Sequence, residues 1–270
     1  MKEQNKNTFQ FVDAHIHLWE LQRISYPWLM PPFSDDGPNG SVEPIAHDYT
    51  LDDYFDDARE FNLVKAVHID AGAHPSEAIR ETRWLQELAD KTGFPHAIVG
   101  FAALNDPDVA ETLAQHVESR NVRGIRHIIN WHPDPKRTYM PRNLLDDPAF
   151  ARGYALLKKY NLSFDLQIYP NQMQGAYELI EQHPQTQVII NHMGMPVDAD
   201  KSQWMNGLKM LSALPHVAVK ISGFGFIKRQ WTLNDVKPLV EQVIECFDMN
   251  RVMFASDFPT DKLFNTFAQS

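Results

Sequence analysis

Two histidines separated by one residue, His15 and His17, end the first apolar run of the sequence, FVDAHIHLWE. Side chains at positions i and i+2 of a strand point to the same side, so the two imidazoles project together. A histidine can ligate a divalent metal, transfer a proton or polarise a carbonyl group. Two hydrogen-bonded core or loop histidines would give the same pattern, so the pair needs partners before it predicts a site.

Two later segments supply such partners. His192, in NHMG, follows the sixth apolar run, and Asp257, in ASDFP, follows the eighth. A carboxylate next to histidines can act as a general base, although Asp257 could instead cap the turn before Pro259. If the runs are parallel strands of one barrel, their carboxyl ends meet at one cavity, and the four side chains converge there.

The elements that would position these residues alternate along the chain. Short apolar, often β-branched runs are separated by longer amphipathic segments, which is the pattern of strand-helix units around a parallel sheet. This predicts a single-domain α/β (β/α)8 barrel, a TIM barrel, over residues 1–270. The eight strand candidates are Phe9–Ala14, Leu63–Ile69, Ala97–Phe101, Val122–Ile129, Leu162–Ile168, Val188–Asn191, Val217–Ile221 and Val252–Ala255.

Seven helices are expected between the strands. The first opens at Thr50, with Asp53 three residues later as a capping box. The others begin near Pro75, Pro107, Pro148, Asn171, Gln203 and Leu233. Only DKLFNTFAQS follows the last strand segment, so the eighth outer helix is expected to be truncated.

Composition excludes several classes of function. Lys and Arg total 25 against 35 Asp and Glu, a net charge of −10, which disfavours nucleic acid as a partner. No run approaches the roughly 18 apolar residues of a membrane span, and the polar start MKEQNKNTFQ shows no targeting segment. Cys246 is the single cysteine, so no internal disulfide calls for an oxidising compartment, and a cytoplasmic location is expected.

Six segments in a fixed order resemble the amidohydrolase superfamily. They are FVDAHIHLWE with YPW, VRGIRH followed by PDP, LSFDLQIYP, INHMGMP, VKISG and VMFASDFP, and they span about Phe9 to Pro259. The resemblance is narrower to the amidohydrolase-related branch (family 2), which includes sugar-acid lactonases such as L-fuconolactonase and 2-pyrone-4,6-dicarboxylate hydrolase. It implies a (β/α)8 barrel and a hydrolase.

The resemblance also implies roles for individual residues. Asp257 would be the general base that takes a proton from water as it attacks a lactone carbonyl. His15, His17, His192 and Arg126 would surround the carbonyl, with Arg126 or His127 polarising its oxygen. The implied substrate is a small polar lactone, derived from a sugar acid or a related cyclic ester.

The metal content is left open by the sequence. Superfamily members with two metals use a carboxylated lysine on strand four and a histidine on strand five, but here these strands read GIRHII and FDLQIY. A binuclear centre is therefore not expected. One divalent ion, zinc or manganese, could be held by His15, His17, His192 and Asp257. A metal-independent hydrolase is the alternative, as in some relatives of this branch.

Further residues at strand ends are candidates for binding substrate. By alternation Arg126 faces opposite to Arg123 and His127, so only some of these can point into the mouth. Trp28 lies in the long segment Arg23–His47, which would overhang the site, whereas His68, His74 and His132 are expected as solvated loop histidines. The predicted substrate-binding residues are His127, Gln167, Tyr169, Lys220, Ser222 and Trp28.

Two other functions remain open from the sequence. A metal-dependent decarboxylase or hydratase of an unsaturated or aromatic acid would use similar residues, although the missing strand-five histidine counts against it. A barrel that binds a small molecule without catalysis is the third hypothesis. A homodimer is also compatible with the sequence, because a truncated eighth helix would leave apolar barrel wall for a second subunit to cover.

Overall fold

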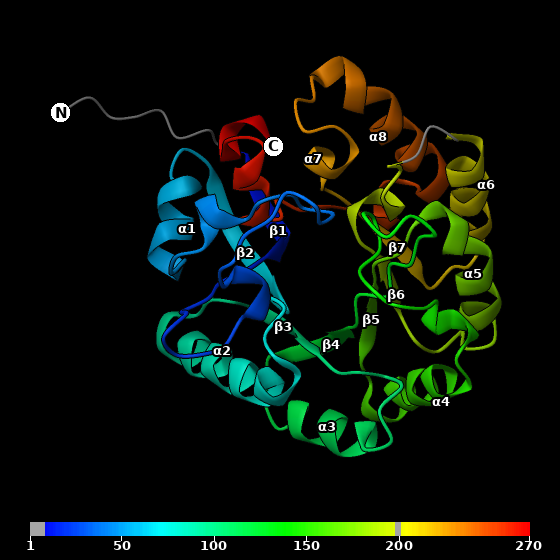
Figure 1. Ribbon diagram of the computed structural model, residues 1–270, viewed down its shortest axis with the longest axis horizontal. Coiled ribbons are helices and arrows are strands. Elements are labelled where there is room, and N and C mark those ends of the chain that lie inside the picture. Colours follow the sequence, from blue (N-terminus) through cyan, green and yellow to red (C-terminus); the bar gives the residue numbers. More distant parts are fainter. Residues whose placement is uncertain (1–8, 198–200) are drawn as a thin grey trace.

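In the computed structural model, eight parallel strands form one sheet whose order follows the chain from β1 to β8 (Figure 1). The structure describes residues 9–197 and 201–270; the N-terminal residues 1–8, on which the targeting prediction partly rests, lie outside them. The strands are β1 Gln10–Ile16, β2 Asn62–Ile69, β3 Ala97–Phe101, β4 Val122–Arg126, β5 Ser163–Leu166, β6 Val188–Ile190, β7 Val217–Ile221 and β8 Val252–Phe254.

In residues 9–197 and 201–270, seven α-helices surround the sheet, and an additional short helix lies in the loop after β7. The surrounding helices are α1 Leu51–Asp57, α2 Ala78–Thr92, α3 Val109–His116, α4 Pro148–Leu156, α5 Met173–Glu181, α6 Lys201–Ser212 and α8 Leu233–Phe247, and the short one is α7 Phe224–Ile227. The predicted capping box of α1 is present: the Thr50 side chain accepts from Asp53 N, and Asp53 accepts from Thr50 N. None of the helices in the described ranges is both long and apolar enough to cross a bilayer.

The chain after β8 contains only two 3-10 turns, Thr260–Leu263 and Phe267–Gln269. Within residues 255–270 no α-helix follows β8. The (β/α)8 class is therefore confirmed. Several details differ from the prediction: β1 runs to Ile16 rather than Ala14, β4 ends at Arg126 rather than Ile129, β5 ends at Leu166 rather than Ile168, and α7 was not expected.

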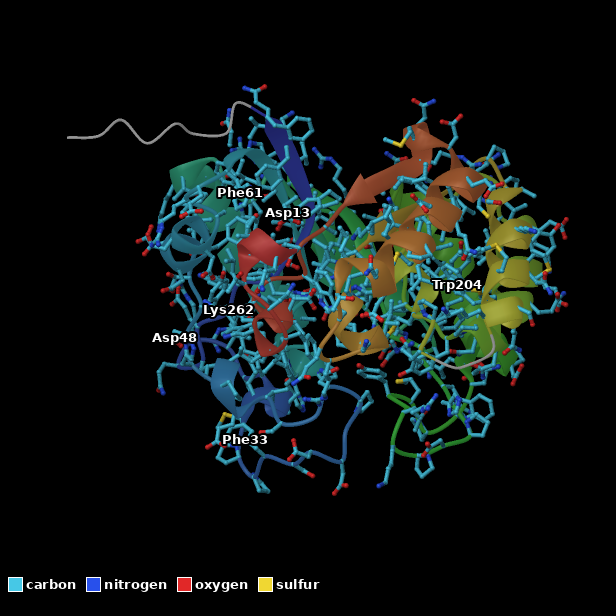
Figure 2. The ribbon with its side chains drawn as sticks, turned by 90° about the horizontal axis from the view of Figure 1, so that it is seen from above. Asp13, Phe33, Asp48, Phe61, Trp204 and Lys262 are labelled. Atoms are coloured by element: carbon cyan, nitrogen blue, oxygen red, sulfur yellow. The ribbon has the colours of Figure 1, made fainter. Side chains whose placement is uncertain are left out.

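The core follows from strands that are buried on both faces. One set of side chains fills the barrel, and the alternate set packs against the helices, as Val188 and Ile190 do when they join the same buried cluster as Trp204 of α6. The long segment after β1, which carries Phe33, lies at the opposite end of the molecule from Phe61 and the start of β2 (Figure 2). That end is the mouth, where the carboxyl ends of the strands meet.

Candidate active site

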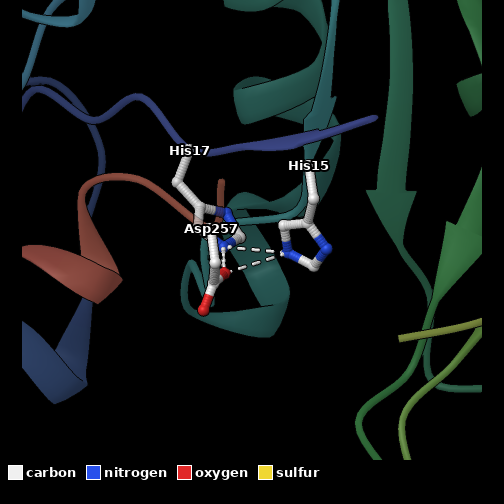
Figure 3. Close-up of side chains that lie close together, drawn as sticks. All are labelled: His15, His17 and Asp257. Atoms are coloured by element: carbon white, nitrogen blue, oxygen red, sulfur yellow. Dashed lines mark hydrogen bonds and ion pairs between the residues drawn. The ribbon is translucent and has the colours of Figure 1, made fainter. Parts of the chain in front are cut away.

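His15 and His17 point into the mouth from the end of β1 (Figure 3). Their Nε2 atoms lie 3.2 Å apart, and the Oδ1 atom of Asp257 is 3.3 Å from the first and 3.2 Å from the second. The other ring nitrogen of His17, Nδ1, is 2.8 Å from the carbonyl oxygen of Ile69. All three site side chains are almost completely buried, so small movements would be resisted by the surrounding packing.

Backbone hydrogen bonds place Asp257 opposite these histidines. Asp257 N donates to His15 O over 2.9 Å, and His17 N donates to Phe258 O over 2.8 Å. The backbone of Asp257 is in the left-handed region, with φ 59°, which is tolerated by Asp but disfavoured for most residues. The chain therefore turns its carboxylate inward at a conformational cost that the surrounding bonds offset.

His192 approaches from the turn after β6. Its ring centroid lies 4.9 Å from that of His15, and its Nδ1 is 2.9 Å from the hydroxyl of Ser222, which follows β7. Gly223 makes this approach possible, because a Cβ at that position would come within 2.8 Å of the His192 Cβ. His192 itself has φ 51°. The hydrogen bond to Ser222 therefore fixes the orientation of the His192 imidazole.

Arg126, the last residue of β4, carries the guanidinium of the site. Its Nε donates to Asp70 Oδ2 over 2.6 Å, and its NH2 donates to the backbone oxygen of Asp70. Its NH1 donates to Gln167 Oε1 over 3.2 Å and lies 3.4 Å from His15 Nε2. The guanidinium therefore links β2, β4 and the end of β5 beside the histidine pair.

The protonation states follow from burial and charge. Burial, and then the nearby cation of Lys220, hold the pKa of His15 well below its usual value. Burial lowers the pKa of His192 to about 4. Burial alone would raise the pKa of Asp257, but His192, His17 and Arg126 outweigh it and leave the pKa below its ordinary value. At neutral pH the site holds a carboxylate next to uncharged His15 and His192, which suits a general base.

A cavity of about 240 Å³ opens onto this cluster. Gln167, Arg126 and Trp28 are among the residues that line it, and the Trp28 indole is fixed by its donation to Ala71 O over 2.8 Å. Asn39 and Tyr139, from the loops after β1 and β4, meet at its rim, with Tyr139 Oη donating to Asn39 Oδ1 over 2.7 Å. The lining residues are His17, Trp28, Asn39, Ala71, Gly72, Arg126, Ile128, Tyr139, Gln167, His192, Phe226, Asp257 and Thr260.

Four of the predicted substrate-binding residues are held away from the cavity. Lys220 pairs with Asp165 inside the barrel, Ser222 bonds to His192, and Tyr169 Oη donates to the backbone of Arg137 over 2.6 Å. His127 accepts a hydrogen bond from Leu104 N and packs against Phe101 and Phe150, on the face opposite to Arg126. Successive residues of an extended chain face opposite sides, which explains why His127 points away from the cavity that Arg126 lines.

One histidine differs from its predicted environment. His68 was expected in a solvated loop, but it is fully buried in β2 with Nε2 3.3 Å from Leu18 O. Asp70 was not singled out by the sequence reasoning, although it directly follows the run VKAVHI and therefore stands at a strand end like the other site residues. Asn39 and Tyr139 were also missed, because they lie in loops with no motif, and Phe226 was missed because it lies in the short helix α7, which was not expected.

The residues present fit a single divalent ion by donor type. His15, His17 and Asp257 offer two imidazole nitrogens and a carboxylate oxygen within 4.8 Å of one another, a set that zinc accepts. The second carboxylate oxygen of Asp257, Oδ2, is buried and has no hydrogen-bond partner. His192, the fourth predicted ligand, is not part of this group; its Nδ1 is engaged by Ser222.

Comparisons with known proteins agree with this architecture. The sequence model of the family described as amidohydrolase matches residues 12–269. The chain is 42% identical over 263 residues to the uncharacterized protein y4mH of Sinorhizobium fredii, covering 95% of this chain and 87% of that protein. It is 27% identical over 265 residues to L-fucono-1,5-lactonase of Burkholderia multivorans, covering 92% and 81% of the two chains.

A solved structure is also similar. It is an amidohydrolase from Burkholderia multivorans with bound zinc, which superposes with a TM-score of 0.77 at 27% sequence identity. The match covers 96% of this chain and 88% of that chain. The resemblance noted in the sequence motifs is thereby confirmed.

Proposed function

The chain belongs to the amidohydrolase family, and we propose that it is a hydrolase that opens a small polar lactone, either a sugar-acid lactone or a related cyclic ester. The observation that carries the proposal is the buried Asp257 carboxylate, held 3.2 Å from His17 and facing a small cavity. The 27% identity to L-fucono-1,5-lactonase of Burkholderia multivorans supports the choice of a lactone.

Each step uses side chains of the site. Asp257 accepts a proton from a water molecule as the water oxygen adds to the lactone carbonyl carbon. Arg126 and the neighbouring imidazoles stabilise the negative charge that develops on the carbonyl oxygen. The bond from the carbonyl carbon to the ring oxygen then breaks, and the proton held by Asp257 passes to that oxygen. The product is an open-chain hydroxy acid.

A metal would add to this chemistry without replacing these residues. His15, His17 and Asp257 would hold one divalent ion, zinc or manganese, and the partnerless Oδ2 of Asp257 is consistent with a missing electropositive neighbour. Such an ion, when bound, supplies a Lewis acid that polarises a carbonyl oxygen. Arg126 and His192, which lie beside His15, would still orient the substrate.

The test is hydrolysis of a panel of sugar-acid lactones. The amount of acid released is measured with the protein as purified and again after chelation. Turnover that survives chelation supports a metal-independent lactonase. Turnover that is lost and then restored by one divalent ion supports the metal-assisted form. Absence of turnover on every lactone, by folded protein in both states and with zinc or manganese added, would contradict the proposal.

A further inference from the structure

We infer that Asp70 determines the charge class of the substrate: by occupying the guanidinium of Arg126, it restricts the site to lactones that carry no ionised carboxylate. This inference rests on the proposed lactonase function and deepens it. An arginine in such a cavity would otherwise indicate a substrate with a carboxylate, because a guanidinium with free donors binds both carboxylate oxygens. The pairing of Arg126 with Asp70 removes that indication.

The hydrogen bonds of Arg126 carry the argument. A guanidinium has five N–H donors, and a carboxylate is clamped by two that lie side by side on one edge. The edge formed by Nε and NH2 is occupied by Asp70 Oδ2 and Asp70 O. NH1 donates to Gln167 and contacts His15. One N–H of NH2 is left over, which can serve a single carbonyl oxygen but not both oxygens of a carboxylate.

A substrate carboxylate would not easily displace Asp70. The Asp70 side chain is 2% exposed, and its Oδ1 accepts from Gly72 N over 2.9 Å. Burial would raise the pKa of Asp70, but Arg126 lowers it below the ordinary value, so the carboxyl stays ionised. Removing one partner of a buried ion pair leaves the other charge uncompensated, which is strongly unfavourable.

The remaining walls of the cavity offer no second clamp. Among the described residues that line it, Arg126 is the single Lys or Arg, and Trp28, Ile128 and Phe226 supply apolar surface. Lys220, the nearby buried ammonium, is bound to Asp165. A volume of about 240 Å³ is below the roughly 300 Å³ at which pockets for drug-sized ligands begin, so it fits one small ring.

The experiment compares two lactones that differ only in charge: 6-oxotetrahydropyran-2-carboxylate and its carboxamide, with unsubstituted δ-valerolactone as a reference. We expect kcat/KM for the carboxamide to exceed that for the carboxylate by about tenfold or more, because the carboxylate finds no free pair of donors. Equal or faster turnover of the carboxylate would overturn the inference and leave the lactonase function standing.

A binding measurement keeps the inference testable if the chosen rings are poor substrates. The corresponding lactams, piperidinone carboxylate and carboxamide, cannot be opened readily, and their affinities can be compared by calorimetry on the same protein. Tighter binding of the carboxamide supports the inference, and tighter binding of the carboxylate overturns it. Neither result depends on turnover.

A pair of variants separates this role of Asp70 from a merely structural one. In Asp70→Asn the guanidinium loses its charged partner, so the ratio of carboxylate to carboxamide kcat/KM should rise about tenfold. Asp165→Asn is the matched control, because Asp165 is also a buried carboxylate paired with a cation but does not line the cavity. Its ratio should not change. An unchanged ratio in a folded Asp70→Asn protein would contradict the inference, and if that variant does not fold, the lactam affinities decide.

Discussion

The first and last strands of the barrel, β1 and β8, lie next to each other, and we call the line along which they meet the seam. The two ends of this seam are held together in different ways. At the mouth, the chain just after β8 is bonded to β1 by Asp257 N to His15 O, by His17 N to Phe258 O, and by Ser256 N to the Asp13 carboxylate. At the opposite end, β8 pairs with β7, and no ladder to β1 is found in the described residues. Aromatic side chains fill the space there instead.

The aromatic end is a cluster centred on Phe267. Its ring centroid lies 5.6 Å from that of Phe61 and 6.2 Å from that of Phe11. It also lies 5.0 Å from the ring of Phe258, whose backbone oxygen accepts from His17 N at the mouth, so this ring joins the cluster to the mouth. Aromatic packing stabilises the fold but depends only weakly on the relative orientation of the rings, whereas hydrogen bonds fix the angle and distance of their partners. The comparison teaches that directional bonds are used where the side chains of His15, His17 and Asp257 are held close together, and apolar packing where the strands need only be joined.

The largest expected effect lies at the mouth. Asp257→Asn should lower kcat on a hydrolysed lactone by about a thousandfold, because it removes the proposed general base while keeping the shape of the side chain. The measurement is steady-state hydrolysis together with a melting curve. Asp261→Asn is the control, since Asp261 is equally buried but lies outside the cavity, and its kcat should change less than about threefold. Full activity of a folded Asp257→Asn protein would contradict the proposed role of Asp257, and with it the contrast between the mouth and the aromatic end.

The pH dependence tests the same end of the seam. The pKa values of His15 and His192 are lowered in the folded protein, so between pH 6.5 and about 4 the unfolded chain binds more protons and stability falls as pH falls. Buried His68, whose pKa burial lowers to about 3, adds to this slope.

The melting temperature should therefore decline from pH 6.5 downward, whereas kcat/KM of the folded enzyme stays level until about pH 4, where His192 gains its proton. Differential scanning calorimetry and initial rates across this range check both curves. His192→Gln should reduce the slope of the melting temperature. A melting temperature that is constant from pH 7 to 4.5 would show that these histidines are not buried and neutral.

The aromatic end should respond in stability rather than in catalysis. Phe267→Ala removes a ring that is 7% exposed and should lower the free energy of unfolding by about 3 kcal/mol. At this chain length that corresponds to roughly 6–10 °C in melting temperature. The kcat at 25 °C should remain within about twofold, in contrast to Asp257→Asn. A large loss of kcat in folded Phe267→Ala would show that the two ends are not independent.

The smallest expected effect concerns Glu81 of α2, which is buried beside Asp70 at the mouth. Burial, with the charge of Asp70, raises the pKa of Glu81 to about 8. Its stabilising contribution is therefore present at low pH and is lost as pH rises toward 8 and beyond. Glu81→Gln keeps an acceptor for Ala71 N and should gain about 1–2 kcal/mol relative to the parent between pH 5 and pH 8.5.

The control for this substitution is Glu87→Gln on the same helix, where the side chain is 62% exposed. Its melting temperature relative to the parent protein should not vary with pH. A gain for Glu81→Gln that is the same at pH 5 and pH 8.5 would argue against a buried, protonated carboxyl.

Much of the fold could be predicted because its signals are local. Apolar runs marked all eight strands, and the Thr50 capping box marked the start of α1. The ends of elements were less certain: β4 stops at Arg126, although the apolar run continues to Ile129. The four-residue helix α7 carries too few residues to show a period.

The candidate site was predictable to the extent that it follows strand ends. His15, His17 and Asp257 come together as the barrel hypothesis required, and Arg126 faces inward as alternation allows. Their catalytic roles stay predictions. The loop residues that complete the cavity, such as Asn39 and Tyr139, could not be found, since a loop has no periodicity that tells which side chain turns inward.

By itself, the sequence determined the alternation of strands and helices, the family, and the residue types at the strand ends, because each depends on neighbours within a few positions. Only the tertiary structure decided which charges are paired. Asp70 and Arg126 are 56 residues apart, as are Lys220 and Asp165 at 55, and nothing local links them. They meet because barrel closure buries them together, where a charge is stable only beside its opposite.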